Sequence, residues 1–217
     1  ADGDMVEKTI FSVFAICAQI QMLASTFFHW FGCMGKTTFS LVAKMDYTGI
    51  AVMIVGSYYP LLYYFFFCEP FWMVFYMSLI AILGVATLLV SWLPWFQQPQ
   101  YAPLRALTFI SLGSTCLFMI PHFLSLDPTP YGCLLRMLFM GVTYVTGAGV
   151  YATNVPERWF PGEFDNYMAS HNIWHLFVLG GAVMVYVCCY FVREWRLNHP
   201  CEMDSIQEVV VLNCDSF

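Results

Sequence analysis

The hydrophobic positions of this chain collect in long blocks separated by short polar segments, several of which contain proline. Each block is about 20 residues long, the length that an α-helix needs to cross the hydrocarbon core of a bilayer. The pattern therefore predicts an all-α fold, a polytopic transmembrane bundle with six spans. The blocks lie near residues 9–31, 45–67, 70–93, 104–124, 133–153 and 168–192.

The connections between the blocks are mostly short. Residues 68–70 leave room for little more than a turn, so the second and third spans should form a tight hairpin. The longest connection, 154–167, combines prolines, charges and aromatic residues, which suits a loop at the membrane interface with its charges in solvent. We expect a transmembrane domain over 1–200 and a C-terminal tail over 201–217, mostly polar and acidic.

The composition agrees with insertion in a bilayer. Hydrophobic residues make up 60% of the chain and charged residues 10%, whereas a soluble domain carries about 25% charged residues. The net charge of −6 comes without a basic cluster, so we predict no contact with nucleic acid. The nine cysteines include no CxxC motif, and we infer neither a disulfide framework nor a thiolate metal site.

Small residues gather in the last two blocks. Gly147 and Gly149 lie in the fifth block, and Gly180 and Gly181 lie in the sixth. Glycines inside membrane helices are typical of close helix packing. We expect these glycines to bring helices together and to have no chemical role.

The alternation of the spans decides which polar residues can meet, because successive helices cross the membrane in opposite directions. We call the face where the first span begins side A and the opposite face side B. His29 ends the first span, Asp46 begins the second, and His171 and His175 begin the sixth. All four residues should therefore lie at side B. His122 ends the fourth span at side A and cannot join them.

Polar side chains inside membrane spans are costly, which makes them candidates for function. His171 and His175 are four residues apart, so their imidazoles project from one helix face. His29 would complete a three-histidine site, and three protein ligands leave a position for water, as in catalytic zinc sites. Ser25 lies one turn before His29 on the same face. Asp46 is expected to bind the metal or to hold its water.

Each of these residues also has a simpler interpretation. The histidines could hydrogen-bond across the bundle, Asp46 could cap the start of the second span, and Ser25 could bond to a carbonyl of its own helix. Imidazole also suits copper, iron and nickel. Four basic residues fall on each side under this topology, so the positive-inside rule does not orient the chain.

Four long segments of the chain resemble the adiponectin receptors, which belong to the progestin and adipoQ receptor family. The resemblance runs from about Glu7 to about Glu194 and is most specific at PERWFPGEFD followed by SHNIWH. The matching segments are STFFHWFGC (25–33), KMDYTGIAVMIVGSYYPLLYYFF (44–66), YVTGAGVYATNVPERWFPGEFDNY (144–167) and SHNIWHLFVLGGA (170–182).

This resemblance implies seven spans, of which six are present, because the family's cytoplasmic N-terminal region and first span have no counterpart here. It implies a multi-pass protein of the plasma membrane with an extracellular C-terminus, so that side B faces the cytoplasm. By motif, the family's zinc ligands map onto His29, His171 and His175. Asp46 would touch the zinc through water, and Ser25 matches a further shared polar position.

Two functions follow from the resemblance. The first is a receptor that also acts as a zinc-dependent ceramidase, with Asp46 orienting or deprotonating a zinc-activated water and Ser25 stabilising the oxyanion. The ceramide-like lipid would enter from the bilayer. The second is a non-enzymatic hormone or steroid receptor in which the zinc is structural. An extracellular adiponectin-like protein, a steroid or membrane lipid alone remain open as the ligand. A transporter is disfavoured because no clear inverted repeat is visible.

Overall fold

The computed structural model describes residues 2–126, 131–164, 167–199 and 201, so most of the predicted tail lies outside the described residues. Within these residues the predicted all-helical architecture is confirmed, and six helical segments are long and apolar enough to cross a membrane. The helices are α1 (Asp2–Phe31), α2 (Lys36–Phe65), α3 (Pro70–Ser91), α4 (Ala102–Gly113), α5 (Cys116–Leu126), α6 (Tyr131–Thr153) and α7 (Ser170–Asn198), with short 3₁₀ turns η1 (Gly32–Met34), η2 (Trp95–Gln97) and η3 (Pro99–Tyr101).

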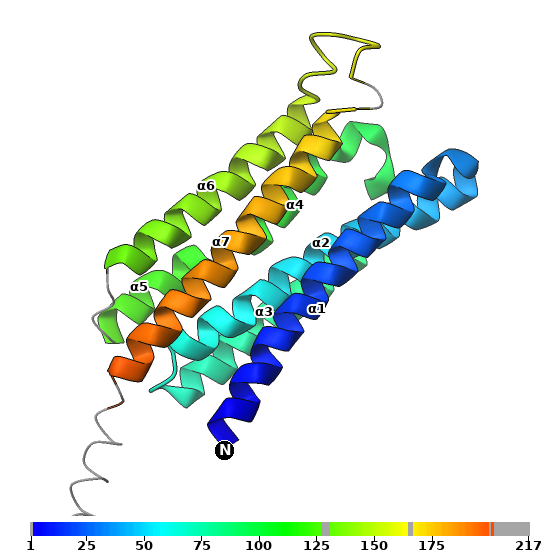
Figure 1. Cartoon of the computed structure of the whole chain (residues 1–217). Coiled ribbons are helices and arrows are strands. Elements are labelled where there is room, and N and C mark those ends of the chain that lie inside the picture. Colours follow the sequence, from blue (N-terminus) through cyan, green and yellow to red (C-terminus); the bar gives the residue numbers. More distant parts are fainter. Residues whose placement is uncertain (1, 127–130, 165–166, 200, 202–217) are drawn as a thin grey trace, which may run out of the picture.

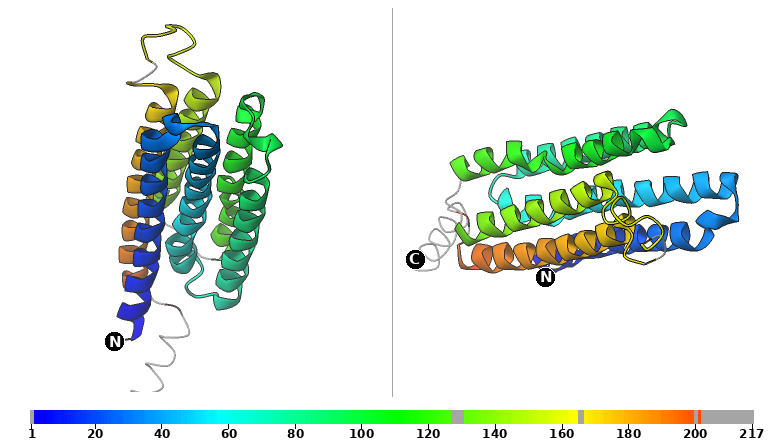
Figure 2. Two further views of the ribbon diagram at one scale, coloured as in Figure 1. Left: turned by 90° about the vertical axis from the view of Figure 1, so that its right-hand side faces the viewer. Right: turned by 90° about the horizontal axis from the view of Figure 1, so that it is seen from above.

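The helix α2 is the centre of the bundle. It packs against α1, α3, α4 and α7, while α6 packs against α7 and α4. The helices run alongside one another, as the three views show (Figures 1 and 2). The start of α1 and the end of α7 lie at the same end, which is side A, and the connection between α6 and α7 extends beyond the bundle at side B (Figure 1).

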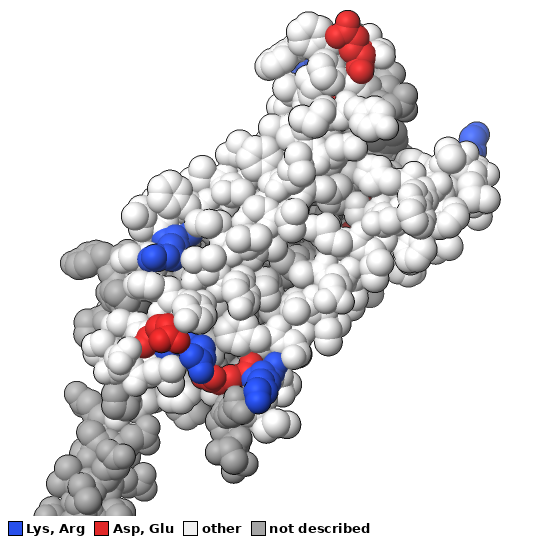
Figure 3. Space-filling view, in the orientation of Figure 1, with Lys and Arg blue, Asp and Glu red and all other residues white. Residues whose placement is uncertain are grey.

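The outer surface of the bundle is apolar between its two ends. On the face drawn in Figure 3, charged side chains gather near the ends, and the surface between them is largely uncharged. Large hydrophobic side chains such as Phe71, Ile82 and Leu89 are about two-thirds exposed. A surface of this kind is stable against lipid chains rather than water, so the exposed residues agree with spans that face a bilayer.

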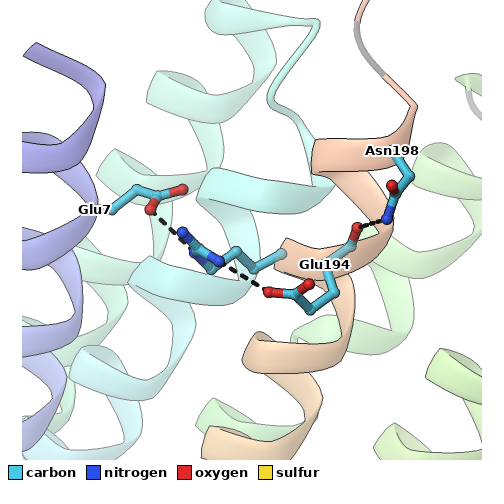
Figure 4. Close-up of polar contacts among 4 residues, drawn as sticks. Glu7, Glu194 and Asn198 are labelled. Carbon is cyan, nitrogen blue, oxygen red and sulfur yellow. Dashed lines mark hydrogen bonds and ion pairs between the residues drawn. The ribbon is translucent and has the colours of Figure 1, made fainter. Parts of the chain in front are cut away.

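At side A, an ion pair and a disulfide connect segments that are distant in the sequence. Arg193 of α7 donates through Nε to Glu7 of α1 at 3.0 Å and through Nη1 to Glu194 at 2.9 Å (Figure 4). Cys68, between α2 and α3, forms a disulfide with Cys201, just beyond α7. The sequence analysis did not predict this bridge, because it relied on local cysteine spacing and the bridged cysteines lie 133 positions apart.

The fourth predicted span, 104–124, consists of two helices. The chain leaves the helical path between Gly113 and Cys116, where free backbone groups need partners because the membrane core supplies no water. The Tyr58 hydroxyl of α2 provides them: it donates to the Gly113 carbonyl and accepts from the Cys116 N–H and the Thr115 hydroxyl, both at 3.0 Å. Hydrophobic periodicity gives no sign of this interruption, because the hydroxyl group that satisfies the free backbone groups belongs to another helix.

The start of α2 also differs from the prediction. The helix begins at Lys36, whereas the apolar block was predicted to begin near residue 45; residues 36–44, which mix polar and apolar side chains, are helical as well. Asp46 consequently lies in the helix interior with 1% of its surface exposed. The alternative that Asp46 caps the start of α2 is wrong.

Candidate metal centre

Three imidazoles meet at side B. His29 lies in the last turn of α1, and His171 and His175 lie in the first turns of α7. Each offers a ligand nitrogen, and these nitrogens all lie within 4.8 Å of one another. The ring centroids of His171 and His175 are 4.9 Å apart, and that of His29 lies 5.1 Å from the centroid of His171. The chain thus brings its first and last helices together around one group that could hold a metal ion.

Asp46 of α2 lies beside this group. Its Oδ2 is 3.2 Å from Nε2 of His171. Within the described part of the chain, neither carboxylate oxygen of Asp46 accepts a hydrogen bond of standard geometry. Nε2 of His171 makes no such hydrogen bond with these residues either. Buried polar atoms are nearly always satisfied by protein, water or an ion, so these three atoms indicate a site for a ligand.

The face of α1 that carries His29 contributes two further polar side chains. Ser25 Oγ is 2.7 Å from Nε2 of His175, rather than bonded to a carbonyl of its own helix. Gln21, one turn earlier, has its Nε2 3.3 Å from Nδ1 of His175. Sequence reasoning missed Gln21, although a glutamine four residues before Ser25 inside an apolar block was a usable signal.

The ring of His171 is held by aromatic neighbours. Phe28 of α1 stacks on it with centroids 5.3 Å apart, and Tyr151 of α6 meets it edge-on at 5.5 Å. The centre therefore includes residues of α6 as well as α1, α2 and α7.

The beginning of α7 is fixed by Glu157 from the preceding loop. Ser170 donates its backbone N–H and its hydroxyl to Oε1 of Glu157, at 2.7 and 2.8 Å. Burial opposes the charged form of Glu157, but the hydrogen bonds to its carboxylate, together with the charge of nearby His171, outweigh burial and hold the pKa of Glu157 below its ordinary value of 4.5. Glu157 therefore joins the loop to the first residue of α7.

A cavity of about 490 Å³ opens beside His171 and extends between α2, α4, α5, α6 and α7. Most of its lining is apolar, with side chains such as Phe109, Met137 and Val178. A cavity of this size and character is typical of a small-molecule or lipid site.

Polar residues line the part of the cavity formed by the side B portions of α2, α4 and α6, and His171 lies there too. Arg105 is 4% exposed, lies over the ring of Tyr47 at 5.2 Å, and donates through Nη1 to the carbonyls of Phe96 and Gln98. Tyr47 and Tyr151 line the cavity with it. Sequence reasoning did not single out Arg105, because no spacing motif links it to the histidines.

His122 lies apart from this centre. Its Nδ1 is 2.8 Å from the hydroxyl of Tyr76, in an aromatic cluster on α3 and α5 that also includes Trp72. This position agrees with the prediction from span alternation that His122 cannot join the other histidines.

Comparison with known proteins places the chain in a family. Residues 1–186 match the family described as haemolysin-III related. Heptahelical transmembrane protein 4 of Arabidopsis thaliana is 39% identical over 187 residues, which cover 85% of this chain and 49% of the relative. The adiponectin receptor protein of Drosophila melanogaster is 38% identical over 184 residues, covering 83% and 41%.

A third relative, progestin and adipoQ receptor-like protein 1 of Caenorhabditis elegans, is 32% identical over 202 residues, which cover 90% of this chain and 46% of the relative. The chain spans about half the length of the curated relatives that it matches. The predicted resemblance to adiponectin receptors is confirmed, and the chain belongs to the haemolysin-III-related family of membrane proteins.

Proposed function

We propose that this chain is an adiponectin-receptor-like membrane protein that binds zinc through His29, His171 and His175 and hydrolyses a ceramide-type lipid amide at that site. The observation that carries the proposal is the buried carboxylate of Asp46 beside three imidazoles at an apolar cavity. This combination offers ligands for a metal, a base for water and space for a lipid.

The residues present suit a zinc ion. Neutral imidazole is a preferred zinc ligand, and three histidines form the ligand set of some catalytic zinc sites. Nε2 of His171 supports the assignment, because it makes no hydrogen bond with the described residues and lies 3.2 Å from the Asp46 carboxylate, so a cation at this point would contact both groups. Asp46 would then lie next to a water molecule beside the ion.

The chemistry of hydrolysis divides among these groups. A zinc ion supplies Lewis acidity, which polarises an amide carbonyl and makes water a better nucleophile. Asp46, whose buried carboxylate lies 3.2 Å from His171, would accept the proton of the attacking water and return it to the amine nitrogen as the amide C–N bond breaks. The Ser25 hydroxyl, which here bonds to His175, would turn to donate to the developing oxyanion.

The cavity supports a lipid substrate. Its apolar walls suit acyl chains, and its volume of about 490 Å³ falls in the usual range for ligand sites of roughly 300–1,000 Å³. Arg105 and Tyr47 offer polar groups beside the metal centre. A ceramide-type lipid combines apolar chains with hydroxyl groups next to the amide, which matches this distribution.

The disulfide supports an orientation. Disulfides persist in oxidising compartments, so the bridge between Cys68 and Cys201 favours an extracellular side A. Side B, with the metal centre, would then face the cytoplasm of a cell whose plasma membrane holds the protein. An adiponectin-like ligand, suggested by the name of the Drosophila relative, would bind at side A.

A second candidate function is a non-enzymatic receptor with a structural zinc ion. The origin of the ligands favours it: one comes from α1 and two from α7, so an ion would tie the first helix to the last. In that case zinc would raise thermal stability without supporting turnover.

The two functions are separated by assaying purified protein in lipid nanodiscs with a long-chain ceramide. We expect chelation to abolish release of fatty acid and added Zn²⁺ to restore it, and we expect His122→Ala to behave as the wild type because His122 lies at side A. Turnover that is unaffected by chelation would contradict the proposal. Stabilisation by zinc without turnover would establish the structural alternative.

A further inference from the structure

Gln21 is a deeply buried polar side chain beside the metal centre. It is 1% exposed, and burial of an amide is unfavourable unless its polar atoms find partners. The amide meets Nδ1 of His175 at 3.3 Å, while its Oε1 has no hydrogen-bond partner among the residues that the structure describes. The amide nitrogen thus meets His175, whereas the amide oxygen has no partner among these residues.

The order of residues along α1 shows which nitrogen of His175 lies nearer the centre. Gln21, Ser25 and His29 follow one another at intervals of one turn on the same helix face. Nδ1 of His175 meets Gln21, and Nε2 meets Ser25, the neighbour of His29. Nε2 is therefore the nitrogen that is directed towards the other two imidazoles.

A neutral imidazole can ligate a metal through one nitrogen only when the other carries the proton. For Nε2 of His175 to be a ligand, Nδ1 must be an N–H group, and this group needs an acceptor. The oxygen and nitrogen of an amide are nearly equal in shape. A flip of about 180° of the Gln21 side-chain amide would exchange its oxygen and nitrogen, so that Oε1 faces Nδ1 of His175.

We propose that Gln21 is the positioning residue of His175: its carbonyl oxygen accepts the Nδ1–H and so presents the lone pair of Nε2 to the metal. The inference rests on the metal site proposed above and adds a residue to it. Gln21 does not touch the ion, and it acts by fixing the tautomer and the orientation of a ligand.

The backbone around Gln21 is held tightly enough for this role. A Cβ atom placed on Gly49 of α2 would lie 2.8 Å from Cα of Gln21, so the two helices are in direct contact at this point. Because Gly49 lies three residues after Asp46 on α2, the same helix contact positions both Gln21 and Asp46.

The test measures the affinity of the purified chain for Zn²⁺ by competition with a chelator. Gln21→Leu removes the acceptor, and we expect affinity to fall about 10- to 100-fold, the usual effect of losing such a partner. Gln21→Glu keeps an acceptor and should bind Zn²⁺ at least as tightly as the wild type. Cys17→Ala is the matched control, because Cys17 lies one turn earlier on α1 and packs against Gly56, away from the histidines.

Thermal unfolding of the metal-free proteins distinguishes a positioning role from a general effect on packing. If Gln21 positions His175, Gln21→Leu should lose more Zn²⁺ affinity than Cys17→Ala, although the two metal-free variants are equally stable. Wild-type affinity in Gln21→Leu would overturn the role of Gln21 and leave the centre in place. If the wild type binds no Zn²⁺, the metal site and the role of Gln21 both fail. Should Gln21→Leu not fold, Gln21→Glu decides, and a tenfold loss in that variant would overturn the inference.

Discussion

At the scale of single residues, alternation of the spans is enough to group His29, Asp46, His171 and His175 from the order of residues along the chain. This reasoning succeeds because each membrane crossing determines how deep a residue lies in the bilayer. Residues at the end of an odd span and at the start of an even span therefore lie at the same membrane face. Gln21 and Arg105 escape this reasoning, since contacts between side chains of different helices depend on helix rotation. Sequence periodicity fixes that rotation only loosely when helices are apolar on all sides.

Asp46 is the residue whose substitution separates chemistry from metal binding. We expect Asp46→Asn to retain zinc while ceramide hydrolysis falls about 10²- to 10⁴-fold, the usual contribution of a general base. Asparagine has the same shape, so the buried site beside His171 is kept. Metal analysis and fatty-acid release on one preparation check both parts. Hydrolysis at the wild-type rate would remove Asp46 from the mechanism.

At the scale of elements, the structure contains the six predicted spans, whereas the early start of α2 and the interruption of the fourth span were not predicted. The apolar blocks predicted where helices cross, because burial in lipid requires an apolar surface. They could not predict the break between α4 and α5, which depends on the Tyr58 hydroxyl, or the early start of α2. The glycine prediction was correct in part: Gly147 and Gly181 lie where α6 and α7 meet, whereas Gly149 faces open space.

The close approach of α6 and α7 gives a prediction about these glycines. A Cβ on Gly181 would collide with the ring of Tyr144, whereas a Cβ on Gly149 would meet no atom of the described residues within 4 Å. Gly181→Ala should destabilise the fold by about 1–3 kcal/mol, a typical cost of overpacking. Gly149→Ala should be neutral or slightly stabilising. Thermal unfolding compares the two variants, and equal midpoints would argue against tight packing at Gly181.

The loop before α7 gives a prediction about pH. The pKa of Glu157 is lowered in the folded protein, so its contribution to stability is present above pH 4.5, the ordinary value, and is lost as pH falls through the lower folded pKa. Glu157→Gln should therefore be less stable than the wild type near neutral pH, with the difference shrinking in acid. Unfolding midpoints of both proteins across this range test the prediction, and a difference independent of pH would contradict it.

At the scale of the whole molecule, the bundle is a membrane fold whose two ends differ in chemistry. Side A carries the disulfide and the ion pair of Glu7 with Arg193, and side B carries His29, His171 and His175. The sequence predicted that these three histidines share side B but left the orientation undecided on charge alone. Folding brings the distant cysteines together, and their bridge supplies an argument that composition could not.

The proposed orientation can be tested with the chain's own cysteines. Cys68 and Cys201 form the side A disulfide, and Cys33 is an exposed free thiol at side B. The sequence has a further cysteine, Cys214, after Cys201, so the proteins compared all carry Cys214→Ser. In that background, on intact cells treated with a reductant, an impermeant maleimide should label the protein that keeps Cys68 and Cys201 but not its Cys68→Ser, Cys201→Ser variant. Labelling of Cys33 should require permeabilised cells, and its labelling on intact cells would reverse the orientation.

The most direct test of the central claim is the metal content of the purified protein, with and without His29. If His29, His171 and His175 hold an ion, elemental analysis will find about one zinc per wild-type chain and a large loss in His29→Ala. Protein free of metal after purification and zinc addition, or equal zinc in the two proteins, would contradict the account.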